Sequence, residues 1–234
     1  MAIHGNRAVS SKSGAADFYS AIGIKIDTPP EKTAELIDKT GFGFLMAPIY
    51  HSAMRFAGPV RKALGIKTIM NVLGPLTNPA GAKYQVLGVY GKELLEPVAR
   101  AAKKLGAKRV MVITSKDGFD EISPCVPTYV YQINEDNKEY KYMINPEDFG
   151  ITDCNVEELS GGTGEENAAL GLEILNGKGR KAIHCAVCLN AGAVLYISGK
   201  VRTLKEGYAL ADEALKSGKT LRKLEEVKQM SYAL

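Results

Sequence analysis

Three segments of the sequence concentrate Gly, Asn, Ser, Asp and His, which are residue types that ligand-binding loops use. The first is residues 4–14, HGNRAVSSKSG, which offers hydroxyls, an amide, a guanidinium, a lysine and backbone N–H groups just before a predicted helix. A helix N-terminus with serine and glycine suits a phosphate, because its free N–H groups and the helix dipole favour negative charge. Composition alone leaves a solvated N-terminal arm with a serine cap as an equal alternative.

Two further segments are candidates on weaker grounds. Residues 71–79, NVLGPLTNP, place two prolines and two asparagines around a glycine, which predicts a rigid turn. Residues 115–123, SKDGFDEIS, follow the most apolar predicted strand and contain the adjacent carboxylates Asp120 and Glu121. Mg²⁺ prefers such hard oxygen ligands, completed by water and substrate phosphates. A plain turn is the alternative for both segments.

Isolated histidines, arginines and cysteines carry less information. His51 and Arg61 lie at a predicted helix, where the arginine could pair with a carboxylate, although a surface arginine is the default. His184 lies in a predicted buried helix and is interpreted as a core histidine with a hydrogen-bond partner. Cys185 and Cys188 are spaced like a redox or zinc pair, but there is no second pair and their neighbours are apolar. We therefore expect buried, reduced thiols.

The composition is that of a folded protein. Of 234 residues, 45% are hydrophobic and 24% are charged, which excludes a disordered chain, a collagen and a coiled coil. The net charge of +4 is too small to indicate nucleic acid or membrane as a partner, but it fits an anionic small substrate. The N-terminus lacks a signal core, and the longest apolar stretch, residues 182–198, is too short for a membrane span. We expect a cytoplasmic protein.

Strand-like and helix-like segments alternate along the chain. Residues 85–90, 93–105 and 109–114 form a predicted strand–helix–strand unit, which is the building block of parallel sheets. Residues 128–133 and 138–144 alternate in polarity around a polar turn, which predicts an antiparallel hairpin. A further strand is predicted at 43–47, and helices at 14–22, 28–39, 52–64, 165–175, 182–197, 204–217 and 221–230.

The predicted fold class is α/β in a single domain that spans residues 1–234. We expect a mostly parallel sheet flanked by helices, an antiparallel hairpin and a helical C-terminal part that covers the sheet. The helix at 28–39 is expected to begin with Thr28 as its N-cap, since Glu31 follows three residues later as in a capping box.

Taken together, these segments resemble anthranilate phosphoribosyltransferases. The resemblance covers essentially the whole chain and implies a phosphoribosyltransferase- or nucleoside phosphorylase-like fold. HGNR, GPLTNP and DGFDEIS in this order are highly specific. The matching stretches are HGNRAVSSKSG at 4–14 with AAD at 15–17, GFGFLMAP at 41–48, HSAM at 51–54, PVRKALGIKTIMNVLGPLTNP at 59–79, LGVY at 87–90, DGFDEIS at 117–123, GGTGEENAAL at 161–170 and the LNAGAVLY helix.

The resemblance implies a glycosyltransferase of tryptophan biosynthesis. It would transfer phosphoribosyl from phosphoribosyl pyrophosphate (PRPP) to the amine of anthranilate and release pyrophosphate. Asp120 and Glu121 would coordinate Mg²⁺, and no catalytic base is implied because the aromatic amine is a neutral nucleophile at pH 7. The residues implied for PRPP are His4, Gly5, Asn6, Arg7, Ala8, Val9, Ser10, Ser11 and Ala15, and those implied for anthranilate are Asn6, Arg61, His4, His51 and Pro75.

The sequence also departs from the family's pattern. The family's N-terminal helical domain, its glycine-rich GTGGD loop and its N-x-S-T segment do not occur, and Ala15 stands where the family usually has a Ser or Thr hydroxyl. Each lost charge-assisted hydrogen bond costs roughly 1.5–3 kcal/mol. We therefore expect this chain alone to bind PRPP poorly and to turn over slowly or not at all. Uncovered apolar surface would favour a homo-oligomer or association with a separate N-terminal half.

Two other functions stay open at this point. Pyrimidine nucleoside phosphorylases share the architecture and also act at a ribose anomeric carbon. A non-catalytic fragment or subunit that only binds an N-terminal partner polypeptide is the second alternative.

Overall fold

The computed structural model describes residues 1–8, 12–53, 56 and 69–234. The chain forms two compact units. Unit 1 comprises Met1–Ala80, Gly161–Lys178 and Gly218–Leu234, and unit 2 comprises Gly81–Ser160 and Gly179–Ser217. Each unit combines a small sheet with packed helices, so the predicted α/β fold class is confirmed. Most of the helix predicted at 52–64 lies outside the described residues.

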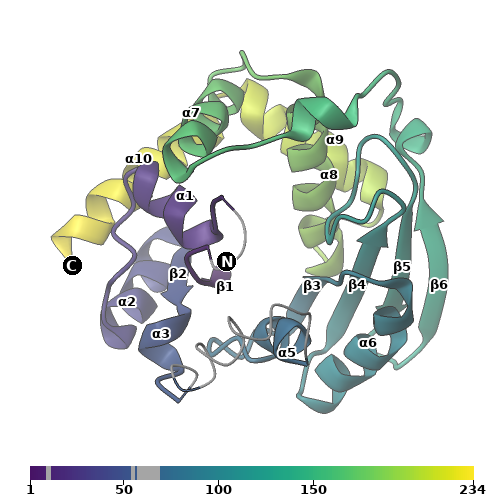
Figure 1. Ribbon diagram of the computed structural model, residues 1–234, viewed down its shortest axis with the longest axis horizontal. Helices are drawn as coiled ribbons and strands as arrows, with labels where there is room; N and C mark the ends of the chain where they lie inside the picture. The colour runs from purple at the N-terminus through teal and green to yellow at the C-terminus, as the bar shows by residue number, and fades with distance from the viewer. Residues whose placement is uncertain (9–11, 54–55, 57–68) are drawn as a thin grey trace. The chain divides into compact units, whose positions relative to one another are not determined.

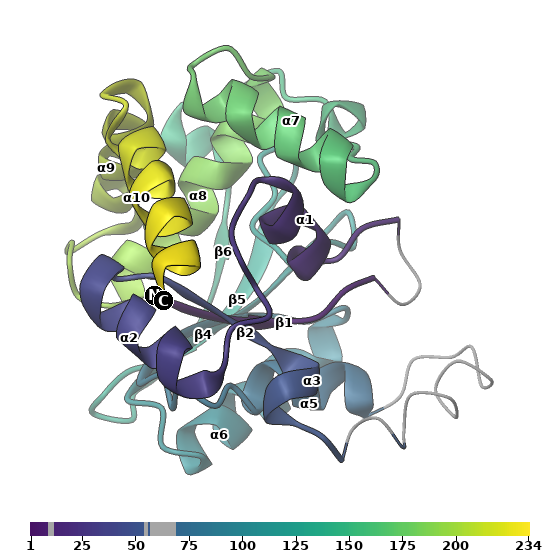
Figure 2. The same ribbon diagram turned by 90° about the vertical axis from the view of Figure 1, so that its left-hand side faces the viewer.

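Unit 1 is built on two short parallel strands. β1 (Ala2–Gly5) pairs with β2 (Gly43–Met46), and Ile3 lies opposite Phe44. Figure 2 shows the two strands side by side. The described helices of this unit are α1 (Ala15–Ala21), α2 (Pro30–Thr40), α3 (Ala47–Tyr50), α5 (Met70–Leu76), α7 (Gly164–Leu175) and α10 (Lys219–Ala233).

Two helices reach unit 1 from the second half of the chain. α7 packs against α1, and α10 packs against α2 (Figure 2). Full burial of one large aliphatic or aromatic side chain contributes roughly 1.5–3 kcal/mol, so this shared core holds β1 and α1 in place. Its buried members are Ala16, Ile22, Ile24, Ile26, Phe44, Ala168 and Val227.

Three local expectations for unit 1 are corrected. Residues 2–5 form a strand that the sequence pattern did not predict, and residues 70–76 form a helix within the segment expected to be a rigid turn. Thr28 is not the N-cap of the next helix, since α2 begins at Pro30 with Pro29 in the cap position. The Thr28 hydroxyl instead donates to the Lys25 carbonyl oxygen at 3.2 Å. Proline is favoured at the first helical position because its fixed φ suits the helix and its missing N–H is not needed there.

Unit 2 contains a four-stranded mixed sheet. β3 (Tyr84–Gly88), β4 (Arg109–Ser115), β5 (Thr128–Ile133) and β6 (Glu139–Ile144) lie in that order. β3 and β4 pair in parallel and the other two pairs are antiparallel, which confirms the predicted strand–helix–strand unit and hairpin. The helical segments of this unit are η1 (Lys92–Leu94), α6 (Leu95–Lys104), η2 (Pro146–Phe149), η3 (Val156–Leu159), α8 (Lys181–Ile197) and α9 (Leu204–Lys216).

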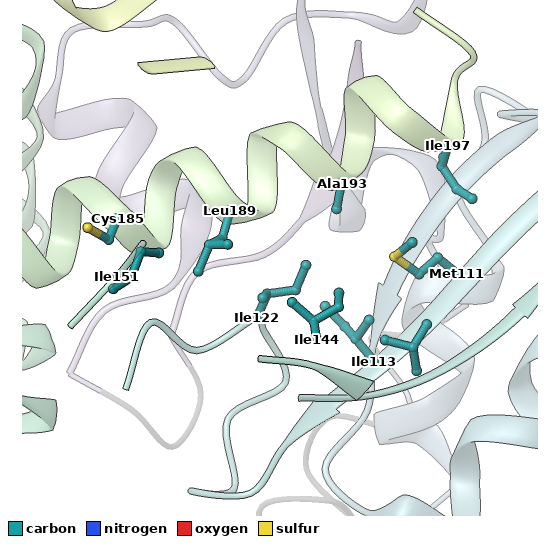
Figure 3. Packing of buried hydrophobic residues seen from close by; sticks show 10 residues of the cluster. Met111, Ile113, Ile122, Ile144, Ile151, Cys185, Leu189, Ala193 and Ile197 are labelled. Atoms are coloured by element: carbon teal, nitrogen blue, oxygen red, sulfur yellow. The ribbon is translucent and has the colours of Figure 1, made fainter. Parts of the chain in front are cut away.

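Helices cover both faces of this sheet, and β4 is buried along most of its length (Figure 1). Successive strand residues point to opposite faces, so Met111 and Ile113 share one face of β4. Figure 3 shows both of them on the side of the sheet where α8 lies, with Leu189 and Ala193. α6 packs on β4 and β5, and α9 packs on α8. Of the C-terminal helices expected to cover the sheet, α7 and α10 belong to unit 1 instead.

α8 coincides with the longest apolar stretch of the sequence. In the described ranges, no helix combines the length and the apolar character that crossing a bilayer would require. The buried residues of α8 pack in the core of unit 2, as the sequence predicted.

Candidate functional site

The N-terminal arm closes on itself around Gly14 in unit 1. A Cβ at this glycine would lie 2.6 Å from the Asn6 carbonyl oxygen and 2.7 Å from the Ala8 nitrogen, so no larger residue fits. The Ala16 N–H donates to the same Asn6 oxygen at 3.2 Å. The end of β1 and the beginning of α1 thus hold each other in a fixed loop.

Asp17 organises this loop from the first turn of α1. Its carboxylate accepts hydrogen bonds from the backbone N–H groups of Ala8 and Gly14, each at 2.9 Å. It also accepts one from Nη1 of Arg7 at 2.9 Å. The two backbone hydrogen bonds, followed by the Arg7 contact, lower the pKa of Asp17 below its ordinary value. An ionised Asp17 therefore fixes the backbone that the sequence assigned to PRPP.

The residues predicted to bind PRPP keep some polar groups available. Asn6 is exposed, and its Oδ1 accepts the Arg7 N–H at 2.8 Å. The Arg7 side chain is 55% exposed and carries five N–H donors, so pairing with Asp17 does not exhaust it. Gly5 faces the Phe44 ring, where a Cβ would come within 3.2 Å. Val9, Ser10 and Ser11 lie outside the described residues.

Two of the residues predicted to bind anthranilate form an aromatic pair. The rings of His4 and His51 meet edge to face, with centroids 4.9 Å apart. Burial, and then the neighbouring His51, lower the pKa of His4, while a hydrogen bond with the Gly74 backbone opposes the shift. Nε2 of His4 is buried without a hydrogen-bond partner among the described residues. This pair offers aromatic edges and, on His4, a ring nitrogen without a partner among the described residues.

α5 and the turn after it contact these histidines. Nε2 of His51 lies 3.1 Å from the Thr77 carbonyl oxygen. Pro75 lies within α5 and follows Gly74 directly in the chain. Nδ2 of Asn78 donates to the Ala2 carbonyl oxygen at 3.1 Å, which ties the turn to β1. Unit 1 therefore gathers His4, His51 and α5, whereas Arg61 lies outside the described residues.

The acidic turn in unit 2 follows β4. The Ser115 hydroxyl donates to the Asp117 carboxylate, and the Ser123 hydroxyl donates to the same carboxylate at 2.7 Å. The Ser115 N–H donates to the Phe119 carbonyl oxygen at 2.9 Å, with Gly118 at a φ of +89° between them. Asp117 is thus engaged within the turn, which leaves the next two carboxylates for a ligand.

Two contacts from other elements of unit 2 position this turn. A Cβ at Gly88 would lie 1.8 Å from the Asp120 carbonyl oxygen, so a glycine at the end of β3 is required for the close approach. Asn190 of α8 binds both backbone groups of Ile122: its Oδ1 accepts the Ile122 N–H and its Nδ2 donates to the Ile122 carbonyl oxygen, both at 3.0 Å. The backbone that carries Asp120 and Glu121 is therefore fixed at both ends.

The chemistry of Asp120 and Glu121 suits Mg²⁺. Within the described ranges, neither carboxylate has a hydrogen-bond or ion-pair partner. Desolvation of the carboxylate, and then the charge of Asp120, raise the pKa of Glu121. Two adjacent carboxylates, without an ion-pair partner among the described residues, match the hard oxygen donors that Mg²⁺ prefers.

Three supporting residues were missed by sequence reasoning. Asp17, Asn78 and Asn190 each position backbone rather than offering chemistry of their own. Asp17 follows Gly14 by three residues, which is the spacing of a capping box and could have indicated its role. No local signal marks the other two, because their partners are 76 and 68 residues away in the chain.

The comparisons with known proteins agree on one family. The model of the glycosyl transferase family, a/b domain, matches residues 1–221. Anthranilate phosphoribosyltransferase of Desulfatibacillum aliphaticivorans is 50% identical over 226 residues, which cover 96% of this chain and 66% of that protein. The same enzyme of Persephonella marina is 46% identical over 231 residues, covering 99% of this chain and 68% of the relative. The chain belongs to the anthranilate phosphoribosyltransferase family.

Solved structures of this family are similar throughout the matched region. The crystal structure of anthranilate phosphoribosyltransferase from Thermus thermophilus has a TM-score of 0.91 and 44% identity, and it covers 99% of this chain. The Saccharomyces cerevisiae enzyme in complex with PRPP and Mg has a TM-score of 0.88 and 30% identity over 100% of this chain. The chain covers 68% and 65% of these two structures, so it spans about two thirds of the length of its relatives.

Proposed function

We propose that this protein transfers phosphoribosyl from PRPP to the amine of anthranilate. Support comes from the family and from the organised site segments in both units. The observation that carries the proposal is the loop fixed by Gly14 and Asp17, which holds the exposed side chains of Asn6 and Arg7 next to each other. The yeast relative was crystallised with PRPP and Mg, and the same enzyme also with 4-fluoroanthranilate.

In this proposal the arm binds the charged end of the donor. Asn6, Arg7 and the arm's backbone N–H groups would hold phosphate oxygens, assisted by Val9, Ser10 and Ser11. The anthranilate nitrogen attacks the ribose anomeric carbon while the bond to pyrophosphate breaks, and the nitrogen then loses its proton. Fixed donors around the leaving group stabilise the charge that develops there, which is the largest contribution expected from this chain.

The acidic turn would hold the metal. We propose that Asp120 and Glu121 bind Mg²⁺; when bound, Mg²⁺ neutralises negative charge on the pyrophosphate. Neither residue needs to exchange a proton during the reaction. Their role is to hold a cation at a backbone position fixed by Gly88 and Asn190.

The proposed acceptor site consists of the histidine pair and α5. The edges of His4 and His51 would contact the anthranilate ring, Pro75 would shape the entry path, and Arg61 would pair with the carboxylate. Asn6 would contact both substrates. A lowered pKa keeps His4 neutral at pH 7, so this residue binds through ring contact and one hydrogen bond rather than through charge.

The test measures anthranilate consumption by fluorescence with PRPP and Mg²⁺. It uses this chain and the chain joined to the segment of the Thermus thermophilus relative that lies outside the matched region. Asp120→Asn or Glu121→Gln should lower kcat/KM about 10- to 150-fold at low Mg²⁺, as expected for losing one charge-assisted contact worth about 1.5–3 kcal/mol. Glu147 is an exposed carboxylate of the same unit, and Glu147→Gln should leave kcat/KM unchanged. Absence of turnover in both forms would refute the proposal.

The two alternative functions predict different results. A nucleoside phosphorylase would cleave thymidine in the presence of phosphate, and a non-catalytic subunit would turn over neither substrate pair. We also propose a cytoplasmic location, which the four free thiols fit, and self-association or association with a separate N-terminal polypeptide. Size-exclusion chromatography with light scattering tests the assembly.

A further inference from the structure

The helix pair α8 and α9 of unit 2 carries a cluster of three side chains that the proposed transfer does not use. His184 and Cys188 lie one turn apart on α8, and Asp212 lies on α9. Nε2 of His184 is 2.7 Å from Oδ1 of Asp212 and 3.6 Å from Sγ of Cys188. The three potential ligand atoms all lie within 4.8 Å of one another.

The fold brings these short side chains together through a close helix crossing. A Cβ at Gly207 of α9 would lie 2.4 Å from the Gly192 carbonyl oxygen of α8, so the two backbones touch there. His184 and Cys188 share a helix face because residues four apart are neighbours. Cys188 precedes Gly192 by four residues and Asp212 follows Gly207 by five, so both lie about one turn from the crossing.

One proton on Nε2 of His184 cannot serve both of its neighbours, the Asp212 carboxylate and the Cys188 sulfur. If Nε2 of His184 carries the proton, it serves Asp212, and the Cys188 thiol hydrogen has no acceptor at that nitrogen. If Nε2 is bare, the thiol can donate to it, but two lone-pair atoms then face each other at 2.7 Å. A cation among the three atoms would satisfy all of them at once.

We propose that His184, Cys188 and Asp212 bind a Zn²⁺-class metal ion. Imidazole nitrogen, thiolate sulfur and carboxylate oxygen are the ligands that zinc takes in proteins, at about 2.0–2.1, 2.3 and 2.0–2.2 Å. In a tetrahedral site these bond lengths place sulfur and nitrogen about 3.6 Å apart, and the observed separation is 3.6 Å. The nitrogen and oxygen must open from 2.7 Å to about 3.4 Å, and the sulfur and oxygen, which lie within 4.8 Å of each other, must come to about 3.6 Å; a side-chain movement of Asp212 would do both.

The burial and charge of the cluster fit such an ion. The side chains of His184 and Asp212 are 24% and 25% exposed, which gives access from solvent and room for a water as fourth ligand. Cys188 is fully buried. Metal binding releases the Cys188 thiol proton to solvent, and the resulting thiolate and the Asp212 carboxylate together neutralise the divalent charge. Mg²⁺ would not compete, because it requires oxygen ligands.

Lys216 is the competing cation at this site. Its Nζ contacts Oδ2 of Asp212 at 2.7 Å, and its side chain is 70% exposed. The lysine leaves Oδ1 free for the metal but reduces the negative charge that attracts it. Its removal should therefore strengthen metal binding, an effect that a purely structural hydrogen-bond network does not predict.

The experiment titrates EDTA-treated, reduced protein with Co²⁺, followed by Zn²⁺ in competition. We expect one equivalent of Co²⁺ with the intense visible bands of a four-coordinate ion and a thiolate charge-transfer band, displaced by Zn²⁺ and not by Mg²⁺. Cys188→Ala should abolish the charge-transfer band. Asp212→Asn and His184→Gln should weaken binding at least about tenfold, and Lys216→Met should tighten it.

Cys185→Ala is the matched control. Cys185 is a second buried thiol on α8, and Figure 3 shows it on the side of the helix where the core residues Leu189 and Ile151 lie. This variant should retain the full Co²⁺ spectrum. Zn²⁺ should raise the Tm of the wild type more than the Tm of Asp212→Asn. The polar Asp212→Asn variant keeps the test valid if Cys188→Ala does not fold. Absence of stoichiometric Co²⁺ binding, or a thiolate band that survives in Cys188→Ala, would overturn the proposal.

Discussion

Gly14 lies directly against the backbone of Asn6, with room for a hydrogen but not for a methyl group. A Cβ at position 14 would be 2.6 Å from the Asn6 carbonyl oxygen. That oxygen also accepts the Ala16 N–H, so the same backbone group ends the strand and supports the helix. The close contact sets the position of the arm that is proposed to bind PRPP.

Replacing Gly14 should therefore displace the arm. In Gly14→Ala the new methyl group meets backbone rather than a flexible side chain, so the arm must move. Because displacement of binding groups by about 1 Å can cost on the order of 100-fold in rate, kcat/KM for PRPP should fall by about that factor. Initial-rate kinetics measure the loss, and thermal unfolding shows whether the core survives. A variant with unchanged kinetics would contradict the role of this contact.

Asp17 should give the loop an acid-sensitive stability. Hydrogen bonds from Ala8 and Gly14 lower its pKa, so its contribution is complete above the ordinary value of 3.8 and is lost as pH falls through the lower folded value. Asp17→Asn should cost about 0.5–2 kcal/mol at neutral pH, the range seen for lost helix caps. Urea unfolding should show this difference shrinking in strong acid. Asp38→Asn, an exposed carboxylate of α2, is the control and should cost little at either pH.

The regular elements of unit 2 could be predicted because their patterns are long. β4 is buried on both faces and reads as an unbroken apolar run, and the β5–β6 hairpin alternates around a polar turn. β1 could not be recognised, since four residues that include His4 and Gly5 carry no period. The pattern of Gly74 and Pro75 predicts a turn, but the structure has the short helix α5, in which little more than one helical turn precedes the proline.

The residue types of the candidate site stand out in the sequence, but the contacts that support them do not. Asp120 and Glu121 are adjacent in the chain, so the sequence alone shows a pair of carboxylates. The HGNR motif identifies the N-terminal arm in the same way. The hydrogen bonds between Asn190 and Ile122 join residues 68 apart, and a pattern of neighbouring letters contains no such pairing. No sequence pattern assigns Asp212 to His184, because the two meet only through the crossing of α8 and α9.

Asn190 should control the metal requirement of the reaction. In Asn190→Ala the Ile122 N–H and carbonyl oxygen lose their partners, at a cost of about 1–3 kcal/mol for each group left unsatisfied. Because Glu121 precedes Ile122, the loosened turn should require more Mg²⁺ for half-maximal activity. Asn190→Asp keeps the acceptor oxygen for the Ile122 N–H, so its Mg²⁺ requirement should lie between those of the wild type and Asn190→Ala. Asn176→Ala, which removes a hydrogen bond at the end of α7, is the control and should leave the Mg²⁺ dependence unchanged.

Ala15 offers a gain-of-function test. It occupies the first position of α1, where the family usually has a hydroxyl, and the loop around it is already fixed by Gly14 and Asp17. Ala15→Ser should lower KM for PRPP by about two- to tenfold, as one added hydrogen bond of about 0.5–1.5 kcal/mol allows. The control is Ala34→Ser on the exposed face of α2, which has the same chemical change away from the site. An unchanged KM in Ala15→Ser would place this residue outside the PRPP site.

The crossing of α8 and α9 should tolerate no added methyl group. In Gly207→Ala the new Cβ would lie 2.4 Å from the Gly192 carbonyl oxygen, and such overpacking costs about 1–3 kcal/mol. Alanine's better helix propensity returns up to about 1 kcal/mol, so the net loss should lower Tm by a few degrees. Gly74→Ala, at a helical glycine where an added Cβ would meet no atom of the described residues within 4 Å, should keep or slightly raise Tm. The same separation of the helices should weaken Co²⁺ binding at His184, Cys188 and Asp212. A Gly207→Ala protein as stable as the wild type would show that the backbones are not in contact.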